Sequence, residues 1–522
     1  MNTNKICFIT CVNDERVYRE SVFYINHLDI PAGFEVQMIQ SKNASSMTQG
    51  YNSAMNSSDA KYKVYFHQDV FIINKNFIHD VIRVFKSNRN IGMMGVAGSK
   101  DMPASGIWWE SRSLYGAVYG SQTDRMELLQ FEDVHEDYFP VQCVDGLILI
   151  TQYDVPWRED LFTGWHFYDI SQSMEFSRVG YKVAIPRQEQ PWCIHDCGIV
   201  NVSNGYDHYR RIFLDEYSKD LFPLVSILIP AYNQPVFLEA ALKSALNQEY
   251  RNCEIIICDD STTDDVRCLI SRYQEDYTCI KYYNNGGPLG GKGALNVQKC
   301  FDICHGQYIS FLFHDDIYMP NKINTMLRYL LDESNIKMVT SYRRLIDDHG
   351  RYLPDLTITQ PLVSENTKIS GYSMGNFILK NIANVIGELT TVMFRKSDIC
   401  GYLTNYYGYN LRCLGDVALW LKLIREGDLV YIREPLSCFR IHDQQNTYNT
   451  EIQLMAAIDW YRLIEISYQN NIFIQNKDDY CSALKKWMTM HKVIIEAMAF
   501  KCEKELYREF IECYQTAQMY AE

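Results

Sequence analysis

The sequence has no surplus of positive charge and no long apolar run. Its 522 residues include 50 Lys and Arg against 64 Asp and Glu, a formal net charge of -14. Proteins that bind nucleic acid usually carry a basic patch for the phosphate backbone, so this balance argues against a nucleic-acid partner. No stretch reaches the roughly 20 apolar residues that span a bilayer, and Met1–Lys5 leads into only a short apolar run. We therefore expect a cytoplasmic protein without a transmembrane segment.

A secretory signal is also missing, and this decides how the 17 cysteines are interpreted. They are scattered through strand-like and helix-like runs of a large chain, which is typical of reduced thiols. The run Cys193–Cys197, with the sequence Cys-Ile-His-Asp-Cys, has residue types that ligate zinc. The second CxxC or HxxxH arm of a tetrahedral site is missing from the sequence, so a structural zinc site is not expected here.

An internal repeat of acidic and histidine positions is the most informative feature present. Three polar positions recur at one constant spacing: Asp69 with Asp316, Asp169 with Asp416, and His195 with His442. Chance rarely keeps separated polar sites in register, and at 47% hydrophobic residues the chain can bury two cores.

The repeat predicts three parts: two copies of one α/β domain at residues 1–220 and 221–450, and a helical C-terminal segment at 451–522. The junction at Asp220–Pro223 has no Gly/Ser-rich linker, which favours a fixed relation between the copies. The tail could pack on either copy, complete an acceptor site or form a contact in a homo-oligomer.

The second copy begins with a β-α-β pattern. An apolar run at 224–233 predicts a buried parallel strand, residues 237–246 a helix, and residues 254–258 a second strand before Asp259 and Asp260. A third strand at 308–313 runs into Asp315 and Asp316. Ligands of open α/β sheets bind at the carboxyl ends of the strands, and paired carboxylates suit Mg²⁺ or Mn²⁺. A turn without a ligand is the alternative interpretation of these acids.

The second copy contains a series of motifs in a fixed order: Ser226–Asn233 (SILIPAYN), Cys258–Ser261 (CDDS), Phe311–Asp316 (FLFHDD), Gly415–Leu423 (GDVALWLKL) and Phe439–His442 (FRIH). This series resembles the family 2 glycosyltransferases over residues 222–446. The resemblance implies a GT-A fold with a Rossmann-like, mostly parallel sheet, a nucleotide-sugar donor, a divalent cation (Mn²⁺ or Mg²⁺) and inversion at the anomeric carbon.

The resemblance also implies roles for individual residues: Pro230 and Tyr232 at the nucleobase, Asp260 hydrogen-bonded to it, Asp315 at the ribose, Asp316 and His442 at the metal, and Asp416 as general base. An inverting transfer needs such a base, although an Asp at a helix start can also serve as an N-cap. Phe313 and Gly415 depart from the family pattern, which more often has acids there. The identity of the donor sugar is left open by these departures.

The first copy shows the same order of strands, at 6–10, 35–39 and 62–66. Its motifs Val64–Val70 (VYFHQDV) and Gly164–Asp169 (GWHFYD) resemble a divergent glycosyltransferase-like domain first associated with streptomycin biosynthesis, over residues 5–200. The resemblance implies these roles: Asp69 and His195 at a metal, Asp169 as base and Thr10 at the nucleotide.

The nucleotide face of the first copy differs from that of the second. Gln68 stands in place of Asp315, and Val12 and Ser41 stand near the positions of Tyr232 and Asp260. Base recognition by the first copy is therefore in doubt.

Two further motifs have competing interpretations. Gly286–Gly293 (GGPLGGKG) nearly spells a P-loop, but Gly293 stands where Ser or Thr would bind Mg²⁺ and no clear apolar strand leads in, so an NTPase is disfavoured. Lys292 is instead expected at a phosphate of the donor. Trp108 and Trp109 offer rings of the kind that stack on sugars, but a place in the core or an interface is favoured.

The sequence thus predicts a hexosyl- or N-acetylhexosaminyltransferase that uses a nucleotide sugar, of the UDP-sugar class, and a protein or glycan hydroxyl as acceptor. Retention of Asp69, Asp169 and His195 favours a bifunctional enzyme with one active site per copy. The replacement of Asp315 by Gln68 favours the alternative, in which 221–450 is the single active domain and the first copy binds the acceptor. A purely structural protein would require both sets of acids to be accidental.

Overall fold

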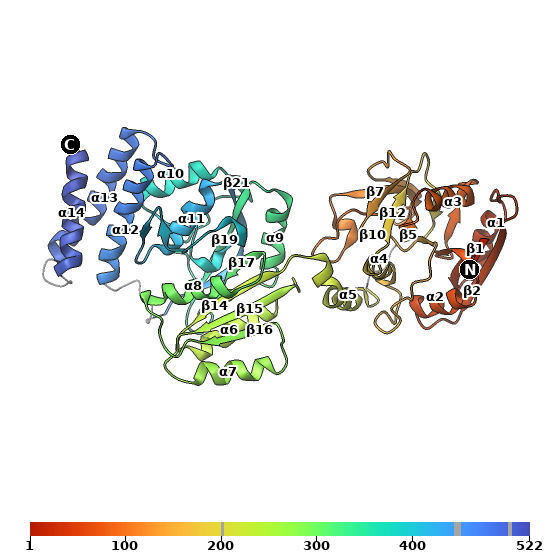
Figure 1. Ribbon diagram of the computed structural model, residues 1–522, viewed down its shortest axis with the longest axis horizontal. Helices are drawn as coiled ribbons and strands as arrows, with labels where there is room; N and C mark the ends of the chain where they lie inside the picture. The colour runs from red at the N-terminus through yellow and green to blue at the C-terminus, as the bar shows by residue number, and fades with distance from the viewer. Residues whose placement is uncertain (200–202, 443–449, 499–503, 522) are drawn as a thin grey trace. The chain divides into compact units, whose positions relative to one another are not determined.

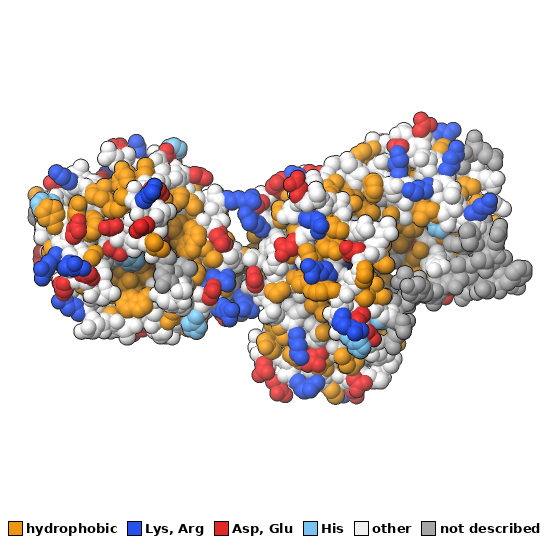
Figure 2. Space-filling view, turned by 180° about the vertical axis from the view of Figure 1, so that it is seen from behind, with side chains coloured by type: hydrophobic (Ala, Val, Ile, Leu, Met, Phe, Trp, Pro, Cys, Tyr) orange, Lys and Arg blue, Asp and Glu red, His pale blue; other side chains and the backbone are white. Residues whose placement is uncertain are grey.

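The computed structural model describes residues 1–199, 203–442, 450–498 and 504–521. This part of the chain forms two compact units, Met1–Leu221 and Phe222–Glu522 (Figure 1). Among the described residues, no helix is long and apolar enough to cross a membrane. On the face drawn in Figure 2, acidic and basic side chains are interspersed, with hydrophobic side chains between them.

The first unit is built on a sheet with the strand order β2-β1-β3-β11-β5-β12-β9. The bounds are β1 Asn2–Val12, β2 Glu35–Lys42, β3 Ala60–Phe66, β5 Ile91–Gly95, β9 Tyr138–Val141, β11 Ile148–Thr151 and β12 Lys182–Pro186. The strands β2, β1 and β3 are parallel, but β11 runs antiparallel to both β3 and β5, and β9 antiparallel to β12. Five of the seven strands (β2, β1, β3, β5 and β12) therefore run in one direction, which confirms the mostly parallel sheet that the sequence predicted, while β11 and β9 run the opposite way.

Strand β1 explains why both faces of this sheet are covered. Successive side chains of a strand point to opposite faces, so Ile6 and Phe8 lie in one core and Cys7 and Ile9 in another. The first core is closed by α1 and α3, and the second by α2 and α4. The helices of this unit are α1 Glu15–Ile25, α2 Met47–Asn56, α3 Phe77–Ser87, α4 Tyr168–Arg178 and α5 Tyr206–Leu221.

A smaller sheet in the first unit positions His195. Its order is β10-β6-β7-β13-β4, with β8 beside β7. The bounds are β4 Val70–Ile72, β6 Ala97–Ser99, β7 Leu114–Gly120, β8 Glu127–Gln130, β10 Cys143–Val144 and β13 Cys193–His195. Because β13 pairs antiparallel with β4 and His195 lies opposite Val70, the imidazole of His195 is brought to the end of β3.

The second unit repeats the strand order of the first: its sheet runs β16-β15-β14-β17-β22-β19-β25-β18, with β20 on β19 and β21 on β25. The bounds are β14 Val225–Ala231, β15 Cys253–Asp259, β16 Ile280–Asn284, β17 Tyr308–Phe311, β18 Ile317–Tyr318, β19 Ile336–Ile346, β20 Tyr352–Leu353, β21 Thr367–Ile369, β22 Val392–Arg395 and β25 Asp428–Arg440. The run β15-β14-β17-β22-β19-β25 corresponds to β2-β1-β3-β11-β5-β12, with the same strand directions. Between β15 and β17 the second unit carries α7 and β16 in addition to the helix α8, whereas α2 alone lies between β2 and β3.

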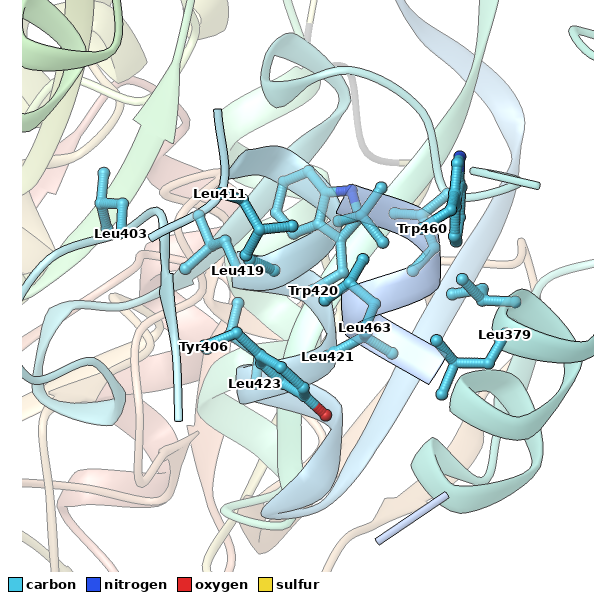
Figure 3. Packing of buried hydrophobic residues seen from close by; sticks show 14 of the residues in the cluster. Leu379, Leu403, Tyr406, Leu411, Leu419, Trp420, Leu421, Leu423, Trp460 and Leu463 are labelled. Atoms are coloured by element: carbon cyan, nitrogen blue, oxygen red, sulfur yellow. The ribbon is translucent and has the colours of Figure 1, made fainter. Parts of the chain in front are cut away.

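The helical tail packs on the second unit rather than standing apart. Leu379 of α10, Trp420 of α11 and Leu463 of α12 belong to one buried cluster, which Figure 3 shows from close by. The helices of this unit are α6 Pro235–Leu246, α7 Asp265–Gln274, α8 Ala294–Ile303, α9 Lys322–Asp332, α10 Gly371–Asn381, α11 Gly415–Arg425, α12 Thr450–Gln469, α13 Lys477–Met498 and α14 Lys504–Ala521. The cluster supports α11, the helix whose first turn carries Asp416.

Replacement of Trp420 by Ala is expected to destabilise the second unit strongly. Trp420 is 0% exposed, and its Nε1 donates a hydrogen bond to the carbonyl oxygen of Gly387 at 3.2 Å. Removing a buried aromatic ring of this size costs about 3–5 kcal/mol of the free energy of unfolding. Urea unfolding followed by circular dichroism measures the loss. The matched control is Tyr372→Ala, whose side chain is 45% exposed and should cost less than about 0.5 kcal/mol; equal losses would contradict the packing described.

Candidate active site

The carboxyl ends of β14 and β15 carry the residues expected at the nucleobase. Tyr232 is 47% exposed directly after β14, so one face of its ring is open to a ligand. Asp260 follows β15 and is 4% exposed; it accepts hydrogen bonds from Asn285 Nδ2 at 2.7 Å and from the backbone N–H of Leu289 at 3.3 Å. Pro230 is buried, and its carbonyl oxygen lies 3.1 Å from His314 Nδ1.

The two adjacent acids after β17 occupy different environments. Asp316 is 0% exposed: its Oδ2 accepts a hydrogen bond from Thr390 Oγ1 at 2.5 Å, and its Oδ1 accepts one from the N–H of Arg440 at 3.1 Å. Burial, followed by the negative charge of Asp315, raises the pKa of Asp316 well above its usual value. Asp315 is partly exposed, and its Oδ2 lies 3.1 Å from His442 Nε2. The carboxylate that faces His442 and solvent is thus Asp315, although the sequence had assigned the metal to Asp316.

Asp416 lies in the first turn of α11, which begins at Gly415 and has Leu414 as its N-cap residue. Asp416 is therefore not the N-cap residue of α11. One carboxylate oxygen of Asp416 accepts a hydrogen bond from its neighbour Val417 N at 2.8 Å, and the other accepts one from Asn384 Nδ2 at 2.8 Å. Burial raises the pKa of Asp416 to about 6. The group is therefore anionic at neutral pH but more basic than an exposed carboxylate, which suits proton abstraction.

Three residues near these acids were missed by sequence reasoning: Asn384, Glu388 and Thr390. Asn384 is fixed by hydrogen bonds to the backbone of Gly387 and holds Asp416 in one orientation. The negative charge of Glu388 contributes to the raised pKa of both Asp316 and Asp416. These residues precede β22 in a segment without helical or strand periodicity. The one local signal that could have indicated a site is the presence of polar residues within an otherwise apolar stretch.

The glycine-rich loop lies between β16 and α8, with Lys292 beside the helical tail. A strand, β16, does lead into it; β16 was missed because its side chains are largely half-exposed and form no apolar run. The ammonium group of Lys292 lies 3.7 Å from Glu451 Oε2 and 3.6 Å from Met455 Sδ of α12, so its nearest partners are on the tail. An open cavity of ≈ 560 Å³ borders the loop, with a lining that includes Lys292, Leu295, Tyr402, Leu411, Arg412 and Met455.

The first unit brings three metal-ligating side chains together at the end of β3. His67 Nδ1 lies 3.3 Å from His195 Nε2, and His195 Nε2 lies 3.5 Å from Asp69 Oδ1. Among the described residues, this is the one group of at least three such ligands whose donor atoms all lie within 4.8 Å of one another. His67 was not among the ligands expected from the sequence. Its Nε2 is hydrogen-bonded to the hydroxyl group of Tyr168 on α4.

Asp169 occupies the same position on α4 that Asp416 occupies on α11. Its Oδ2 accepts a hydrogen bond from the N–H of Gly146 at 2.9 Å. Burial, followed by the negative charge of Asp145, raises the pKa of Asp169 to about 7. Phe167, two residues earlier, has a φ of 62°, a conformation that is strained for a bulky residue and that is concentrated at functional sites.

The strand ends of the first unit that correspond to the expected nucleobase site of the second unit are linked by hydrogen bonds of Gln68. Gln68 Oε1 accepts hydrogen bonds from the backbone N–H groups of Asn13 and Asp14 at 2.9 and 3.0 Å, directly after β1. Thr10 is 0% exposed within β1, and its hydroxyl group has no hydrogen-bond partner among the described residues. Because Thr10 is fully buried, its side chain is not accessible to a nucleotide in this conformation.

The two adjacent tryptophans of the first unit lie in different environments. Trp108 is 8% exposed, and its ring packs on Phe131 at a centroid distance of 6.5 Å. Trp109 is 47% exposed, and its ring lies 5.7 Å from that of Tyr206. The core position favoured by the sequence therefore describes Trp108, while Trp109 keeps an open face.

Comparison with known families assigns both units to glycosyltransferases. Residues 7–217 match a family described as glycosyltransferase like family, and residues 226–399 match glycosyl transferase family 2. The two matches together cover the motifs of the candidate sites up to β22.

Similar proteins include glycosyltransferases with named acceptors. An uncharacterised glycosyltransferase of Rickettsia typhi is 31% identical over 236 residues, 44% of this chain and 68% of that protein. The Escherichia coli UDP-Glc:alpha-D-GlcNAc-diphosphoundecaprenol beta-1,3-glucosyltransferase WfgD is 26% identical over 44% of this chain and 80% of its own length. The Campylobacter jejuni GalNAc(5)-diNAcBac-PP-undecaprenol beta-1,3-glucosyltransferase is 28% identical over 46% of this chain and 71% of its own length.

Proposed function

Since the chain belongs to glycosyltransferase family 2, we propose that it transfers a sugar from a UDP-sugar to a hydroxyl group of a glycan, with inversion at the anomeric carbon. The single observation that carries this proposal is the placement of Asp416. Its carboxylate accepts a hydrogen bond from Asn384 in the first turn of α11 and has a pKa raised to about 6. The negative charge of Glu388 contributes to the raised pKa of both Asp416 and Asp316. A fixed base beside a donor site is what a single displacement requires.

Each candidate site residue of the second unit has one role in the proposed mechanism. Tyr232 stacks on the nucleobase and Asp260 orients it, while Asp315 and His442 would hold a divalent cation. When bound, such a cation would supply positive charge against the departing diphosphate. Asp416 removes the proton from the acceptor hydroxyl as the oxygen attacks the anomeric carbon from the face opposite the diphosphate, so the configuration there inverts.

The residues present fit a divalent cation in the second unit. Asp315 offers a carboxylate oxygen, the ligand that Mg²⁺ and Mn²⁺ prefer, and the Nε2 atom of His442 lies 3.1 Å from it. Asp316 takes a supporting role in this proposal, since Thr390 and Arg440 occupy its oxygens. Its hydrogen bond with the backbone of Arg440 keeps the end of β25, and with it His442, beside Asp315.

The acceptor class is proposed from the relatives. The two glucosyltransferases named above act on glycans linked to diphosphoundecaprenol. We therefore favour a glycan hydroxyl over a protein hydroxyl as the acceptor of this chain, and a hexose or N-acetylhexosamine as the transferred sugar.

The first unit is proposed to be a second transferase site, because Asp69, Asp169 and His195 recur at the positions of Asp316, Asp416 and His442. A specific observation favours the alternative of a non-catalytic acceptor-binding unit. Gln68 is hydrogen-bonded to the backbone of Asn13 and Asp14, where the second unit has the carboxylate of Asp315 beside His442. The two possibilities predict different products of the Asp169→Asn variant.

Incubation of the purified protein with a panel of UDP-sugars, Mn²⁺ and synthetic undecaprenyl-diphosphate-linked saccharides tests the proposal. Mass spectrometry of the extracted products is expected to show a gain of one hexose or N-acetylhexosamine. Nuclear magnetic resonance of the product is expected to show the anomeric configuration opposite to that of the donor. A product that retains the donor configuration would reject Asp416 as the base of a single displacement.

The transfer rate should depend on pH in a way set by Asp416. The base works only when deprotonated, and its pKa is raised to about 6 from the usual value near 3.9. Activity is therefore expected to be constant above pH 7 and to fall about tenfold per pH unit below about pH 6. The profile of kcat/KM at saturating metal measures this. A profile that stays flat down to pH 4.5 would contradict the raised pKa.

A further inference from the structure

The run Cys193–Cys197 lacks a second metal-binding arm in the sequence, but the fold supplies one. The small sheet places His195 beside His67 and Asp69, which follow β3 and are far away in sequence. Cys193 is buried in the core, and the group of ligands whose donor atoms lie within 4.8 Å of one another takes His195 from this run. A metal site is thus assembled from two segments that sequence spacing could not connect.

The distances in this cluster match those between neighbouring ligands of one small cation. A cation bound at about 2.0–2.1 Å from each donor in a tetrahedral site separates neighbouring donors by about 3.4 Å. The observed separations are 3.3 Å between the two imidazole nitrogens and 3.5 Å between His195 Nε2 and Asp69 Oδ1. Two of the three separations between donor atoms are therefore close to the edge of a tetrahedral coordination site, and the third is within 4.8 Å.

Hydrogen bonds within the cluster account less well for its geometry. The distance of 3.5 Å between His195 and Asp69 is long for a hydrogen bond with a carboxylate. Asp69 Oδ1 is buried and accepts no hydrogen bond that satisfies standard geometry among the described residues. A buried carboxylate oxygen needs a positive charge beside it, which either a protonated His195 at 3.5 Å or a metal cation bound between the two groups can supply.

An outer contact fixes which nitrogen of His67 faces the cluster. Nε2 of His67 is hydrogen-bonded to the hydroxyl group of Tyr168, which also donates to the carbonyl oxygen of Gly146 at 3.2 Å. Nδ1 is thereby directed towards His195. Such second contacts orient the imidazole ligands of metal sites.

The second unit does not reproduce this set of ligands. His314, the counterpart of His67, lies with Nδ1 3.1 Å from the carbonyl oxygen of Pro230. His442 faces Asp315, whereas His195 faces Asp69, the counterpart of Asp316. The pairing of β25 with β18 is shifted in register relative to that of β13 with β4, which accounts for the change of partner. The described ligands are therefore two imidazoles and a carboxylate in the first unit, and one imidazole and a carboxylate in the second.

We propose that His67, Asp69 and His195 form a binding site for a transition-metal cation of the Zn²⁺ or Co²⁺ type, in preference to Mg²⁺, and that the two units thereby select different cations. Imidazole nitrogen favours such cations, whereas Mg²⁺ prefers oxygen ligands. The inference deepens the proposed function and rests on it for the use of the cation in transfer. Binding itself is independent of any transfer reaction.

The test uses the full chain, freed of metal with a chelator and titrated with Zn²⁺, Co²⁺ and Mg²⁺ by isothermal calorimetry. One Zn²⁺ is expected to bind to the first unit at least about 100-fold more tightly than Mg²⁺, and Co²⁺ should produce visible d–d absorption bands. His67→Gln, Asp69→Asn and His195→Gln should each weaken Zn²⁺ binding by about 10-fold to 100-fold. The matched control, His314→Gln, removes the counterpart of His67 and should leave the tight site intact.

Circular dichroism of each variant separates loss of the site from loss of folding, and two folded variants of the three suffice for the conclusion. Comparable affinities for Zn²⁺ and Mg²⁺, or tight Zn²⁺ binding that survives all three substitutions, would overturn the proposal. Tight binding by a protein that transfers no sugar would support the site while rejecting the proposed function. Sugar transfer by a protein that shows no tight Zn²⁺ binding would support the proposed function and reject the metal site.

Discussion

Replacement of Asp416 by Asn is expected to lower sugar transfer by the second unit about 100-fold to 10,000-fold while donor binding changes little. The substitution keeps the shape of the side chain, and the amide oxygen can still accept the hydrogen bond from Asn384 or Val417. What is lost is the ability to take a proton from the acceptor hydroxyl. The fall should therefore appear in kcat rather than in the KM for the UDP-sugar.

Initial rates of product formation and calorimetric binding of UDP measure the two quantities separately. Asp276→Asn is the matched control, because it makes the same chemical change at an exposed position after α7 and should preserve the wild-type rate. A second variant, Asn384→Ala, removes the group that orients Asp416 and should lower kcat by a smaller factor. If Asp416→Asn retained more than about a tenth of the wild-type kcat, another group would have to be the base.

The repeated topology could be predicted from the sequence because hydrophobic periodicity and polar residues at strand ends are visible in short stretches of the chain. The apolar run of β14 and the acids after β15 and β17 depend on residues close to one another in the chain, and the repeat of Asp169 as Asp416 is visible when the two halves of the sequence are compared. Asp169 and Asp416 accordingly lie at the same position on α4 and α11. Periodicity and strand-end acids carry this information without any knowledge of the tertiary structure.

The features that could not be predicted depend on strand register and burial. A shift in the pairing of β25 with β18 decides that His442 meets Asp315 and not Asp316, and the sequence contains no local record of that shift. Asp316 has the residue type of a metal ligand, yet Thr390 and Arg440 bury it. Asn384 and His67 were missed for the same reason, since each acts on a residue brought to it by the fold.

The direction of the antiparallel strands β11 and β22 could not be predicted from the sequence either. Both are short apolar runs, and both lie beside strands with which they are not contiguous in sequence. The sequence of a strand that is buried on both faces does not reveal its direction. Such a strand lacks the alternation of apolar and polar residues that is typical of antiparallel strands with one face in solvent. Direction is set by the length and path of the connection, which here includes irregular segments such as the one that carries Asn384 and Glu388.

Replacement of Asp169 by Asn decides whether the first unit is an enzyme. With two active units, the wild-type protein should add two sugars to its acceptor, and Asp169→Asn should remove one of them with a loss of about 100-fold or more, leaving the other to Asp416. The pH dependence should differ as well, since the pKa of Asp169 is raised to about 7 and that of Asp416 to about 6. The first unit should thus lose activity at a higher pH than the second.

Mass spectrometry of products from wild type, Asp169→Asn and Asp416→Asn separates the two addition steps. Asp160→Asn, at an exposed position of the same unit, is the matched control for the substitution itself. If Asp169→Asn gives the same products and rates as wild type, the first unit is a binding unit, in agreement with the closure of its nucleotide face by Gln68. A glycan that binds wild type and Asp169→Asn equally, and that is then elongated by the second unit, would identify what this unit holds.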